Sequence, residues 1–405
     1  MSIFTTNRYA VSLGAAAALL AGCGGSQPPL NASPQGLTSQ QSEEAMGFKR
    51  VHNFGRSAED GKQPEADLID VNGTLYGTTV NGGSGGGYGT VFSITPSRKE
   101  TVLHSFGGPG DGTNPTSRLL DVNGTFYGTT SQGGKNGGGT VFSLSLDGTE
   151  KILHSFDDPS SSPQSGGFTP EAGLIDVQGT LYGTTSQGGD SACGGGGYHC
   201  GTVFSITPDG RFKVLYTFGK QSGDGGFPQA PLLDVDGTLY GTTTSAGIHN
   251  HGTVFSITTA GKEHTVYSFG TSGNDGSNPM SGLIDVQGRL YGTTMNGGSG
   301  DYGTVFAVTT DGVEAVSISL NATYGSQPVA DLKNVKGVLY GTAMNGGTHN
   351  LGTVFRITKG GKATVLHSFS DNNHTLPRAG LAAIGGTLYG TTFGIQNGSV
   401  FSITP

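Results

Sequence analysis

The sequence predicts an all-β fold, a seven-bladed β-propeller with four-stranded blades. Three observations predict it: a composition that disfavours helices, a repeat of about 50 residues found seven times, and chain ends that complete each other. The 405 residues include 75 Gly and 17 Pro, and only 12% are charged, so helices rich in Glu and Lys are excluded. The 33% apolar content, with 20 Phe and 14 Tyr, is enough for a packed core and argues against disorder.

The charge balance narrows the possible partners. Lys and Arg number 21 against 29 Asp and Glu, which gives a net charge of −8, and no basic run occurs. The chain therefore lacks the electrostatic footprint of a nucleic-acid-binding protein or of one attracted to an anionic membrane surface. We expect no nucleic-acid partner.

The N-terminus is expected to be removed or tethered rather than folded. Arg8 precedes a short uncharged stretch that ends in Leu20-Ala21-Gly22-Cys23, which resembles a bacterial lipobox. The resemblance implies a lipoprotein signal peptide over residues 1–22 and lipid attachment at Cys23, which would make the membrane a partner through the anchor. The alternative is an ordinary secretory signal with an incidental cysteine. Gly24 after the cysteine favours the outer membrane or cell surface, and residues 23–46 read as a flexible tether.

A tandem repeat occupies the expected propeller domain, residues 47–405. The tripeptide Tyr-Gly-Thr begins at seven tyrosines, and each is preceded by a proline 12 residues earlier. The tyrosines are Tyr76, Tyr127, Tyr182, Tyr240, Tyr291, Tyr340 and Tyr389. The prolines are Pro64, Pro115, Pro170, Pro228, Pro279, Pro328 and Pro377.

Each repeat resolves into four short strands. In the first, strands are expected at 64–71, 74–79, 89–95 and 100–106, because these runs are rich in β-branched and aromatic residues. Asn72-Gly73 supplies a two-residue hairpin, and a Gly-rich loop separates the second strand from the third. Four-stranded meanders repeated in this way are the sequence form of propeller blades.

The two ends of the array indicate a closed ring. The seventh repeat stops after its third strand, at about 398–404, whereas residues 48–54 form a fourth strand without the other three. We expect these segments to pair, which would satisfy two exposed strand edges. The first strands would then line a channel, and the Gly-rich loops and Asp-Gly-x-x-Pro segments would share one face, the default binding face.

The repeated motifs resemble a known family. Pro-x3-Leu-x-Asp-x2-Gly-x-Leu-Tyr-Gly-Thr-Thr, Gly-Thr-Val-Phe-Ser-Ile and Val-Leu-His-Ser-Phe are similar to the GloVer tandem repeat of bacterial surface and secreted proteins. The resemblance covers about residues 48–405 and implies a cell-surface repeat protein. It carries no assigned reaction, so no catalytic residue is transferred. Unit six departs from the pattern with VSISLNATYG, which makes its outer strand the least certain.

Unit three carries two insertions on the expected loop-rich face. One of them holds Cys193 and Cys200 in SACGGGGYHCG. In an oxidising compartment, two cysteines this close in a long loop predict a disulfide, which would contribute about 2.5 kcal/mol on the chain-entropy model. The alternative, a metal site of both cysteines with His199, needs more ligands than the loop offers.

The histidines and repeated aspartates divide into packing and ligand candidates. His52, His104, His154 and His367 share one position of the fourth strand, where Tyr replaces His in other repeats, and this interchange indicates packing. The loop residues His249 and His251 could share a metal site, although no cofactor is expected. Asp60, Asp111, Asp224 and Asp275 recur in the Asp-Gly-x-x-Pro segment and read as turn residues, with calcium as the weaker alternative.

Catalytic motifs are absent or degenerate. Asp70 and its four counterparts recur before the hairpin turn, which indicates a bond to a turn amide, and no unmatched carboxylate pair stands out. We therefore favour a non-catalytic scaffold, anchored to the cell envelope, that binds an extracellular protein or glycan, over an enzyme. The candidate binding residues on the loop-rich face are Tyr88, Tyr198, His199, His249, His251 and Tyr302. The alternative is an extracytoplasmic hydrolase or lyase, which would require an asymmetric acidic or histidine cluster in the channel mouth.

Overall fold

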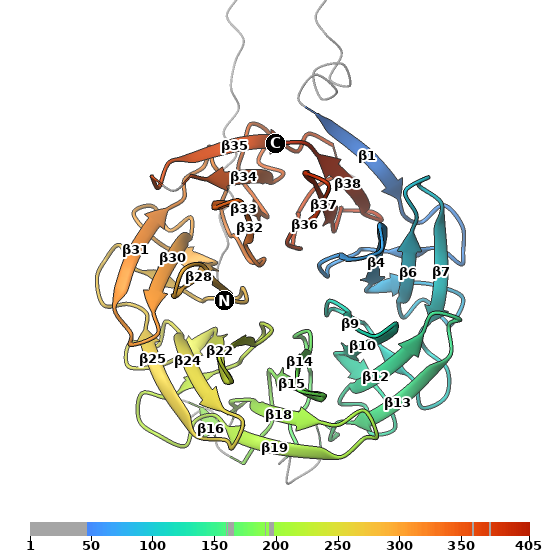
Figure 1. The fold of residues 1–405 in the computed structure, drawn as a ribbon, viewed down its shortest axis with the longest axis horizontal. Helices are drawn as coiled ribbons and strands as arrows, with labels where there is room; N and C mark the ends of the chain where they lie inside the picture. Colours follow the sequence, from blue (N-terminus) through green and yellow to red (C-terminus); the bar gives the residue numbers. More distant parts are fainter. Residues whose placement is uncertain are drawn as a thin grey trace, which may run out of the picture.

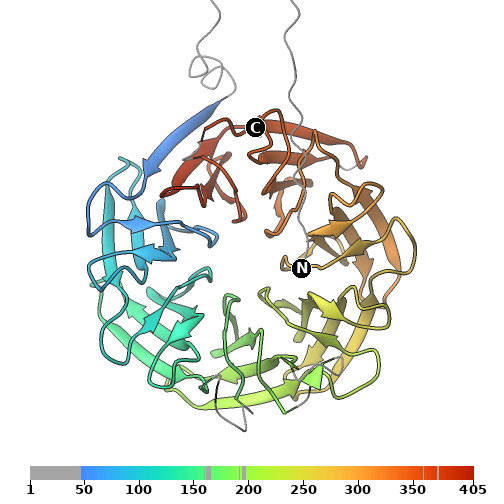
Figure 2. The ribbon, with the colours of Figure 1, turned by 180° about the vertical axis from the view of Figure 1, so that it is seen from behind.

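Seven four-stranded antiparallel sheets form a closed ring. The computed structural model describes residues 47–158, 160, 166–190, 192–193, 198–358, 360–371 and 374–405. Their sheets are arranged around one axis, as Figure 1 shows, and the opposite view in Figure 2 shows the same ring. The predicted seven-bladed propeller is confirmed. No helix in these ranges is long and apolar enough to cross a membrane, and Cys23 and the expected tether lie outside them.

Each blade runs from an innermost to an outermost strand. Blade 1 consists of β3 (Ile69–Val71), β4 (Thr74–Thr79), β6 (Thr90–Ile94) and β7 (Glu100–Ser105). Blade 2 consists of β9 (Leu120–Val122), β10 (Thr125–Thr130), β12 (Thr140–Ser145) and β13 (Glu150–Ser155). Blade 3 consists of β14 (Ile175–Val177), β15 (Thr180–Thr185), β18 (Thr202–Ile206) and β19 (Phe212–Thr217). Blade 4 consists of β21 (Leu233–Val235), β22 (Thr238–Thr243), β24 (Thr253–Thr258) and β25 (Glu263–Ser268). Blades 5 and 6 are β27 (Ile284–Asp285), β28 (Arg289–Thr294), β30 (Thr304–Thr309), β31 (Glu314–Ser319); and β32 (Lys333–Val335), β33 (Val338–Ala343), β34 (Thr353–Ile357), β35 (Ala363–Ser368). The VSISLNATYG segment, assigned above to unit six, instead contributes to β31, the outermost strand of blade 5, and Leu320 is buried in place of the usual Phe.

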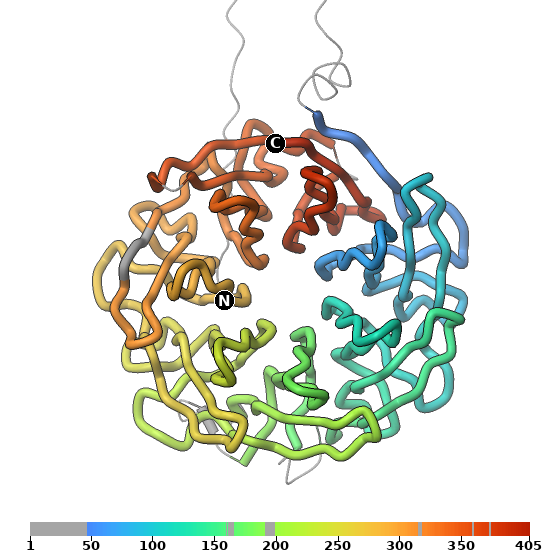
Figure 3. The backbone as a smooth tube through the Cα atoms, in the orientation of Figure 1, coloured from blue at the N-terminus to red at the C-terminus, as the bar shows by residue number. Residues whose placement is uncertain are grey.

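The N-terminal strand completes blade 7, as the chain ends predict. This blade contains β36 (Ala382–Ile384), β37 (Thr387–Thr392) and β38 (Ser399–Ile403), and β1 (Phe48–Asn53) adds the outermost strand. The register runs antiparallel from Phe48 opposite Ile403 to Asn53 opposite Ser399. The first and last strands of the array lie side by side in Figures 1 and 3, blue against dark red.

The hairpin between the two inner strands has the predicted chemistry. Asn72 and Gly73 have φ angles of 54° and 83°, and the Gly73 N–H donates to Asp70 Oδ1 at 2.8 Å. The turn-amide role predicted for the repeated aspartate is confirmed, because the same bond recurs in four other blades. The residues are Asp121, Asp176, Asp234 and Asp285, bonded to Gly124, Gly179, Gly237 and Gly288.

Blades pack against each other through phenylalanine rings. In blade 4, the ring of Phe255 lies over Gly241 of the adjacent strand, its cross-strand partner, and a Cβ on that glycine would lie 2.6 Å from the ring. Phe218, at the end of the preceding blade's outer strand, meets the same ring edge-on, with centroids 5.0 Å apart and planes at 74°. The seven Tyr-Gly-Thr motifs therefore place a small residue where the core ring must lie.

The two threonines that follow this glycine form hydrogen bonds with different partners. The first bridges blades: Thr78 Oγ1 donates to the carbonyl of Ser117 in the next blade at 3.2 Å, and Thr342 Oγ1 to that of Ala379 at 2.8 Å. The second pairs within its blade, as Thr79 Oγ1 does with Thr90 Oγ1 at 2.8 Å. The first threonine thus fixes the segment that enters the innermost strand of the neighbouring blade.

The long loops share one face of the ring, as expected. In blade 1, the crossing segment β2 (Gly61–Lys62) pairs with β5 (Asn81–Gly82) of the Gly-rich loop. Equivalent pairs join β8 (Gly112–Thr113) to β11 (Gln132–Gly133), β20 (Gly225–Gly226) to β23 (Ser245–Ala246), and β26 (Gly276–Ser277) to β29 (Asn296–Gly297). The loop-rich face is therefore ordered by backbone hydrogen bonds rather than open.

Substitution of Gly241 tests this packing. We expect Gly241→Ala to destabilise the protein by about 1–3 kcal/mol, because the added methyl group must displace the Phe255 ring or the Leu232 side chain. Gly273→Ala is the matched control, since a Cβ there would have no neighbour within 4 Å. Urea denaturation of both variants measures the difference, and equal stabilities would contradict the packing role.

Candidate functional site

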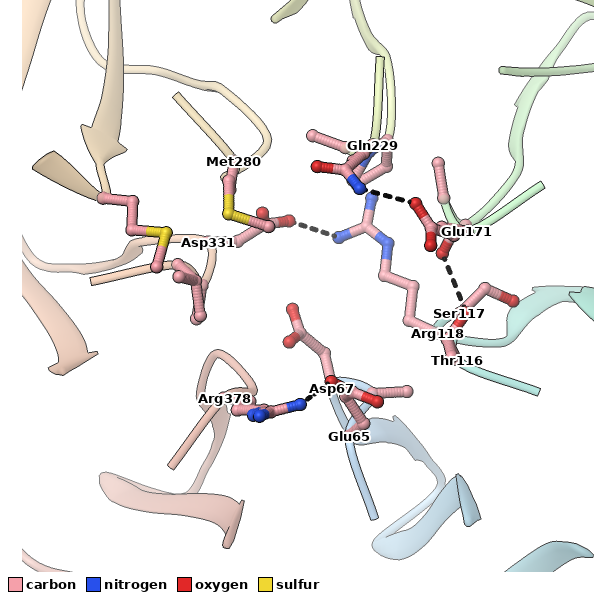
Figure 4. A pocket seen from close by; sticks show the side chains of 18 of the residues that line it. Glu65, Asp67, Thr116, Ser117, Arg118, Glu171, Gln229, Met280, Asp331 and Arg378 are labelled. Carbon is pink, nitrogen blue, oxygen red and sulfur yellow. Dashed lines mark hydrogen bonds and ion pairs between the residues drawn. The ribbon is translucent and has the colours of Figure 1, made fainter. Parts of the chain in front are cut away.

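A cavity of about 380 Å³ opens at the mouth of the central channel, on the loop-rich face. Figure 4 shows its lining, which comes mainly from the residues one and three positions after the repeated proline of each blade. In blade order, the first position holds Glu65, Thr116, Glu171, Gln229, Met280, Val329 and Arg378. The second holds Asp67, Arg118, Gly173, Pro231, Gly282, Asp331 and Gly380. The ring is symmetric here in backbone but not in chemistry.

Glycines make room for the charged side chains of neighbouring blades. At the second position, Asp67, Arg118 and Asp331 each extend over a glycine of an adjacent blade. A Cβ on Gly380 would lie 2.9 Å from the Asp67 carboxylate, one on Gly173 2.6 Å from Arg118, and one on Gly282 2.8 Å from Asp331. Any larger residue at these glycines would close the cavity or displace its charges.

Main-chain amides hold the two aspartates in place. The Gly380 N–H donates to Asp67 Oδ1 and the Gly282 N–H to Asp331 Oδ1, both at 2.5 Å. Arg118 approaches Asp331 with Nη1 3.5 Å from Oδ2. Both carboxylates therefore receive a donor from the scaffold, and both residues line the cavity.

The first position adds two further polar pairs. Arg378 Nη1 donates to Glu65 Oε1 at 2.6 Å, and the same guanidinium lies 4.4 Å above the ring of Phe393. Gln229 Nε2 donates to Glu171 Oε2 at 2.8 Å. These contacts fix the side chains before any ligand arrives.

The electrostatic balance of the mouth is acidic. Its described lining contains four carboxylates and two guanidinium groups. Burial, together with the charge of Asp331, raises the pKa of Asp67 to about 6, although the nearby Arg118 acts in the opposite direction. Burial also raises the pKa of Glu171, while its bond from Gln229 opposes that shift. Asp67 consequently changes charge close to neutral pH.

One wall of the cavity is apolar. Met280, Met295, Val329 and Met344 line it from blades 5 and 6, and all four are partly exposed. The opposite wall carries the charged groups. A ligand with an apolar face and a polar edge would match both walls, and methionines adapt to irregular shapes.

The acidic pair was missed from the sequence. Asp67 and Asp331 come from blades 1 and 6, so no local sequence pattern marks them as a pair, and neither belongs to the aspartate motifs that repeat from blade to blade. The sequence does hold a signal. The residues one and three positions after the repeated proline vary between blades, whereas the residue between them is Ala or Ser and the residue after them is Leu. The asymmetric cluster required by the enzyme alternative is therefore present.

Two of the loop tyrosines predicted to bind ligand, Tyr88 and Tyr302, lie on different blades. Tyr88 is 48% exposed in blade 1, and Tyr302 is 37% exposed in blade 5. Tyr198 lies in β17 (Tyr198–His199), the strand that also contains His199, but its side chain is outside the described part of the chain. Tyr88 and Tyr302 are therefore separate exposed positions on non-adjacent blades, and the role predicted for Tyr198 stays a prediction.

The other loop candidates stay predictions. His249 and His251 are exposed on the loop that follows β23, beside Gly270, and no cluster of three ligand groups in the described ranges includes them. β16 (Ala192–Cys193) pairs with β17, which puts Cys193 opposite Tyr198, and Cys200 is fully buried. The Cys193 side chain lies outside the description, so the disulfide stays a prediction.

The fourth-strand histidines have two kinds of surroundings. His154 stacks on Phe212 and His367 on Phe48, in both cases with centroids 3.8 Å apart. Burial lowers the pKa of both imidazoles to about 4, so they pack as neutral rings. His52 faces Asp60 instead, and His104 faces Asp111. These two histidines therefore lie beside a carboxylate, which a packing role alone does not explain.

Comparisons with known proteins place the chain in a repeat family. The Gloeobacter/Verrucomicrobia repeat matches residues 32–195 and 191–403, and the chain belongs to this family. The expected GloVer-type repeat is thereby confirmed. Among curated proteins, none matches the sequence.

Two solved structures share the fold. The crystal structure of a putative 6-phosphogluconolactonase from Bacteroides uniformis is 15% identical, with a TM-score of 0.51, and the match covers 80% of this chain and 94% of that one. Another from Bacteroides fragilis is also 15% identical, with a TM-score of 0.49 and coverages of 80% and 92%. At this identity the likeness shows the propeller fold alone.

The raised pKa of Asp67 predicts a pH-dependent stability. The unfolded chain ionises this group near 3.8 and the folded chain near 6, so folding becomes less favourable as the pH rises between these values. Asp67→Asn should therefore stabilise the protein by up to about 3 kcal/mol above pH 6 and have no such effect below about pH 4. Urea denaturation across pH 4–8 measures it, and a gain independent of pH would contradict the shift.

Proposed function

We propose that this protein is a binding protein of the bacterial cell envelope that holds a neutral or amino-sugar unit of a glycan in its channel mouth. The observation that carries the proposal is the asymmetry of that mouth, where otherwise equivalent blade positions carry fixed carboxylates, guanidinium groups, an amide and an apolar wall. Residues that served only ring closure would repeat from blade to blade. The proposal centres the binding face on this mouth, and the loop tyrosines stay predictions.

The chemistry of the mouth favours hydroxyl and ammonium groups. Asp67 and Asp331 present acceptor oxygens that are already oriented by backbone amides, while Arg118 and Gln229 supply donors. Sugar hydroxyls can use both kinds of partner, and the C–H face of a sugar ring can lie against Met280 and Met344. An excess of two carboxylates disfavours uronates and phosphorylated sugars, so the phosphorylated substrate class in the neighbours' names fits poorly here.

One observation favours the hydrolase or lyase alternative. Asp67 has a pKa near 6, which leaves a protonated fraction at neutral pH, and Asp331 nearby has Arg118 as a cationic partner. Two carboxyl groups in one cavity, one of them partly protonated, are components that general acid–base catalysis uses. The alternative requires turnover that depends on both aspartates.

Calorimetric titration distinguishes these functions. Glucosamine, N-acetylglucosamine and glucuronate are titrated into the purified full-length chain, and binding of at least one of the first two but not of glucuronate is expected. Asp67→Asn and Glu171→Gln should weaken that binding about 10-fold or more, since each removes a charge-assisted hydrogen bond. Tyr88→Ala and Tyr302→Ala are matched controls, because both side chains lie away from the mouth.

The contrary outcomes are distinct. Binding that is lost only in the tyrosine variants would place the site on the outer loops, and preferential binding of glucuronate would overturn the charge argument. Release of nitrophenol from a panel of nitrophenyl glycosides by the wild-type chain, abolished in Asp67→Asn and Asp331→Asn, would establish the hydrolase instead.

We also propose that Cys23 anchors the protein in the envelope, with the outer membrane or cell surface as its destination. The lipobox-like sequence before this residue supports the anchor. Mass spectrometry of the N-terminal peptide, from a bacterial host that processes lipoproteins, should show cleavage before Cys23 and a diacylglyceryl group on it. Cys23→Ser should abolish both changes and release the protein from membranes, whereas an unmodified cysteine in the wild-type peptide would rule the anchor out.

A further inference from the structure

Among the residues that the structure describes, three side chains meet at each of four junctions on the outer perimeter of the ring. The outermost strand of one blade supplies His or Tyr, the crossing segment supplies Asp, and the outermost strand of the next blade supplies Glu. The sets are His52–Asp60–Glu100, His104–Asp111–Glu150, Tyr216–Asp224–Glu263 and Tyr267–Asp275–Glu314. Where Phe212 or Phe48 replaces the glutamate, the ring stacks on the histidine instead.

The tyrosine junctions are closed by hydrogen bonds. Tyr216 donates its hydroxyl to Asp224 at 2.8 Å. Tyr267 donates to Asp275 at 2.9 Å and lies 3.2 Å from a Glu314 oxygen. The phenol therefore bonds one oxygen of the aspartate in each set, and one carboxylate oxygen per junction, Asp224 Oδ1 or Glu314 Oε1, is left without a partner.

The first histidine junction is not closed in this way. His52 Nε2 lies 3.9 Å from Asp60 Oδ1, beyond hydrogen-bond distance, and the two side chains are only 8% and 6% exposed. Both atoms, together with Glu100 Oε1, are buried and have no hydrogen-bond partner. Three groups able to ligate a metal thus converge within 4.8 Å of one another. Unsatisfied buried polar atoms are costly, and three at one point indicate a missing partner.

We propose that His52, Asp60 and Glu100 bind one divalent transition-metal ion, of the zinc or manganese class. An imidazole nitrogen and two carboxylate oxygens are ligands that such ions take at about 2.0–2.2 Å. Two ionised carboxylates would neutralise the charge of the ion, and the ion would partner all three buried atoms at once. The site is distinct from the channel mouth and does not depend on the proposed glycan function.

The surroundings supply orientation and access. Asp60 Oδ2 accepts a hydrogen bond from the Arg56 backbone N–H at 2.9 Å, which holds the other oxygen, Oδ1, toward His52. The three groups also line a surface groove of about 800 Å³, which gives an ion a route from solvent and leaves space for water as a further ligand.

The second histidine junction provides a contrast within the same chain. His104 Nε2 lies 3.3 Å from Asp111 Oδ2 and 3.6 Å from Glu150 Oε2, so its imidazole already has a hydrogen-bond partner. This junction resembles the closed tyrosine junctions more than the first one. At this second junction only Glu150 Oε1 is buried without a partner, whereas at the junction between blades 7 and 1 all three groups have such an atom.

The position of the proposed ion suggests what it does. His52 belongs to β1, the strand that closes the ring, whereas Glu100 begins β7 of blade 1. An ion held by both would link the closing strand to the next blade. Metal binding should then stabilise ring closure, because an ion that binds only the folded chain raises its stability by mass action.

Equilibrium dialysis tests the site. The full-length chain, without a histidine tag and treated with a chelator, is dialysed against micromolar ZnCl₂ or MnCl₂, and the bound metal is counted by mass spectrometry. We expect one equivalent that is lost in Glu100→Gln and Asp60→Asn. Glu263→Gln, at the closed Tyr216 junction, is the matched control and should retain it.

A second measurement needs no variant. Addition of the metal to the wild-type chain should raise its melting temperature and slow hydrogen exchange of the β1 amides, residues 48–53, more than exchange at β31. The proposal is overturned if no metal binds, if Glu100→Gln and Asp60→Asn keep the bound equivalent while folded, or if β1 exchange does not respond. Equal loss of metal in Glu263→Gln would also overturn it.

Discussion

The contact of each third-strand phenylalanine with the glycine opposite it sets the geometry on which the ring depends. Phe255 lies over Gly241 and meets the ring of Phe218 from the preceding blade, so one ring links two strands of its own blade to that preceding blade. Both faces of every blade need such a neighbour, because an uncovered face would expose apolar residues to water. The same need explains why β1 must return to blade 7, where Phe54 meets Phe92 of blade 1 at 4.9 Å and completes the circle.

The repeated frame carries a channel mouth that is not repeated. Thr78 and Thr342 hold the carbonyls of Ser117 and Ala379, the residues beside Arg118 and Arg378 in sequence. The segment that leads into the innermost strand is therefore positioned by a hydrogen bond common to the blades. The side chains next to the bonded carbonyl in sequence, such as Arg118 and Arg378, can differ between blades. A site built on such elements can be rigid without a conserved loop, and its chemistry is set by substitutions that leave the frame intact.

Much of the fold could be predicted because its signals are local and repeated. The Pro-to-Tyr spacing and the Asn-Gly turns predict the strands of each blade. The unmatched fourth strand predicts that the chain ends pair, as β1 and β38 do. The channel mouth could not be predicted in the same way. Asp67 and Asp331 are far apart in sequence, and their approach depends on the ring radius and on the space left by Gly380 and Gly282, which only the assembled blades define.

The outer junctions show why a repeat position does not by itself define a role. Interchange of His and Tyr at one strand position indicates packing, and this interpretation describes His154 and His367, each of which stacks on a phenylalanine. The same position in β1 places His52 beside two carboxylates, because the neighbouring blade supplies Glu100 where another blade supplies Phe212. The chemistry of a junction is thus decided by a pair of residues from adjacent repeats. Sequence analysis of a closed array should compare residues across junctions as well as down the columns of a repeat.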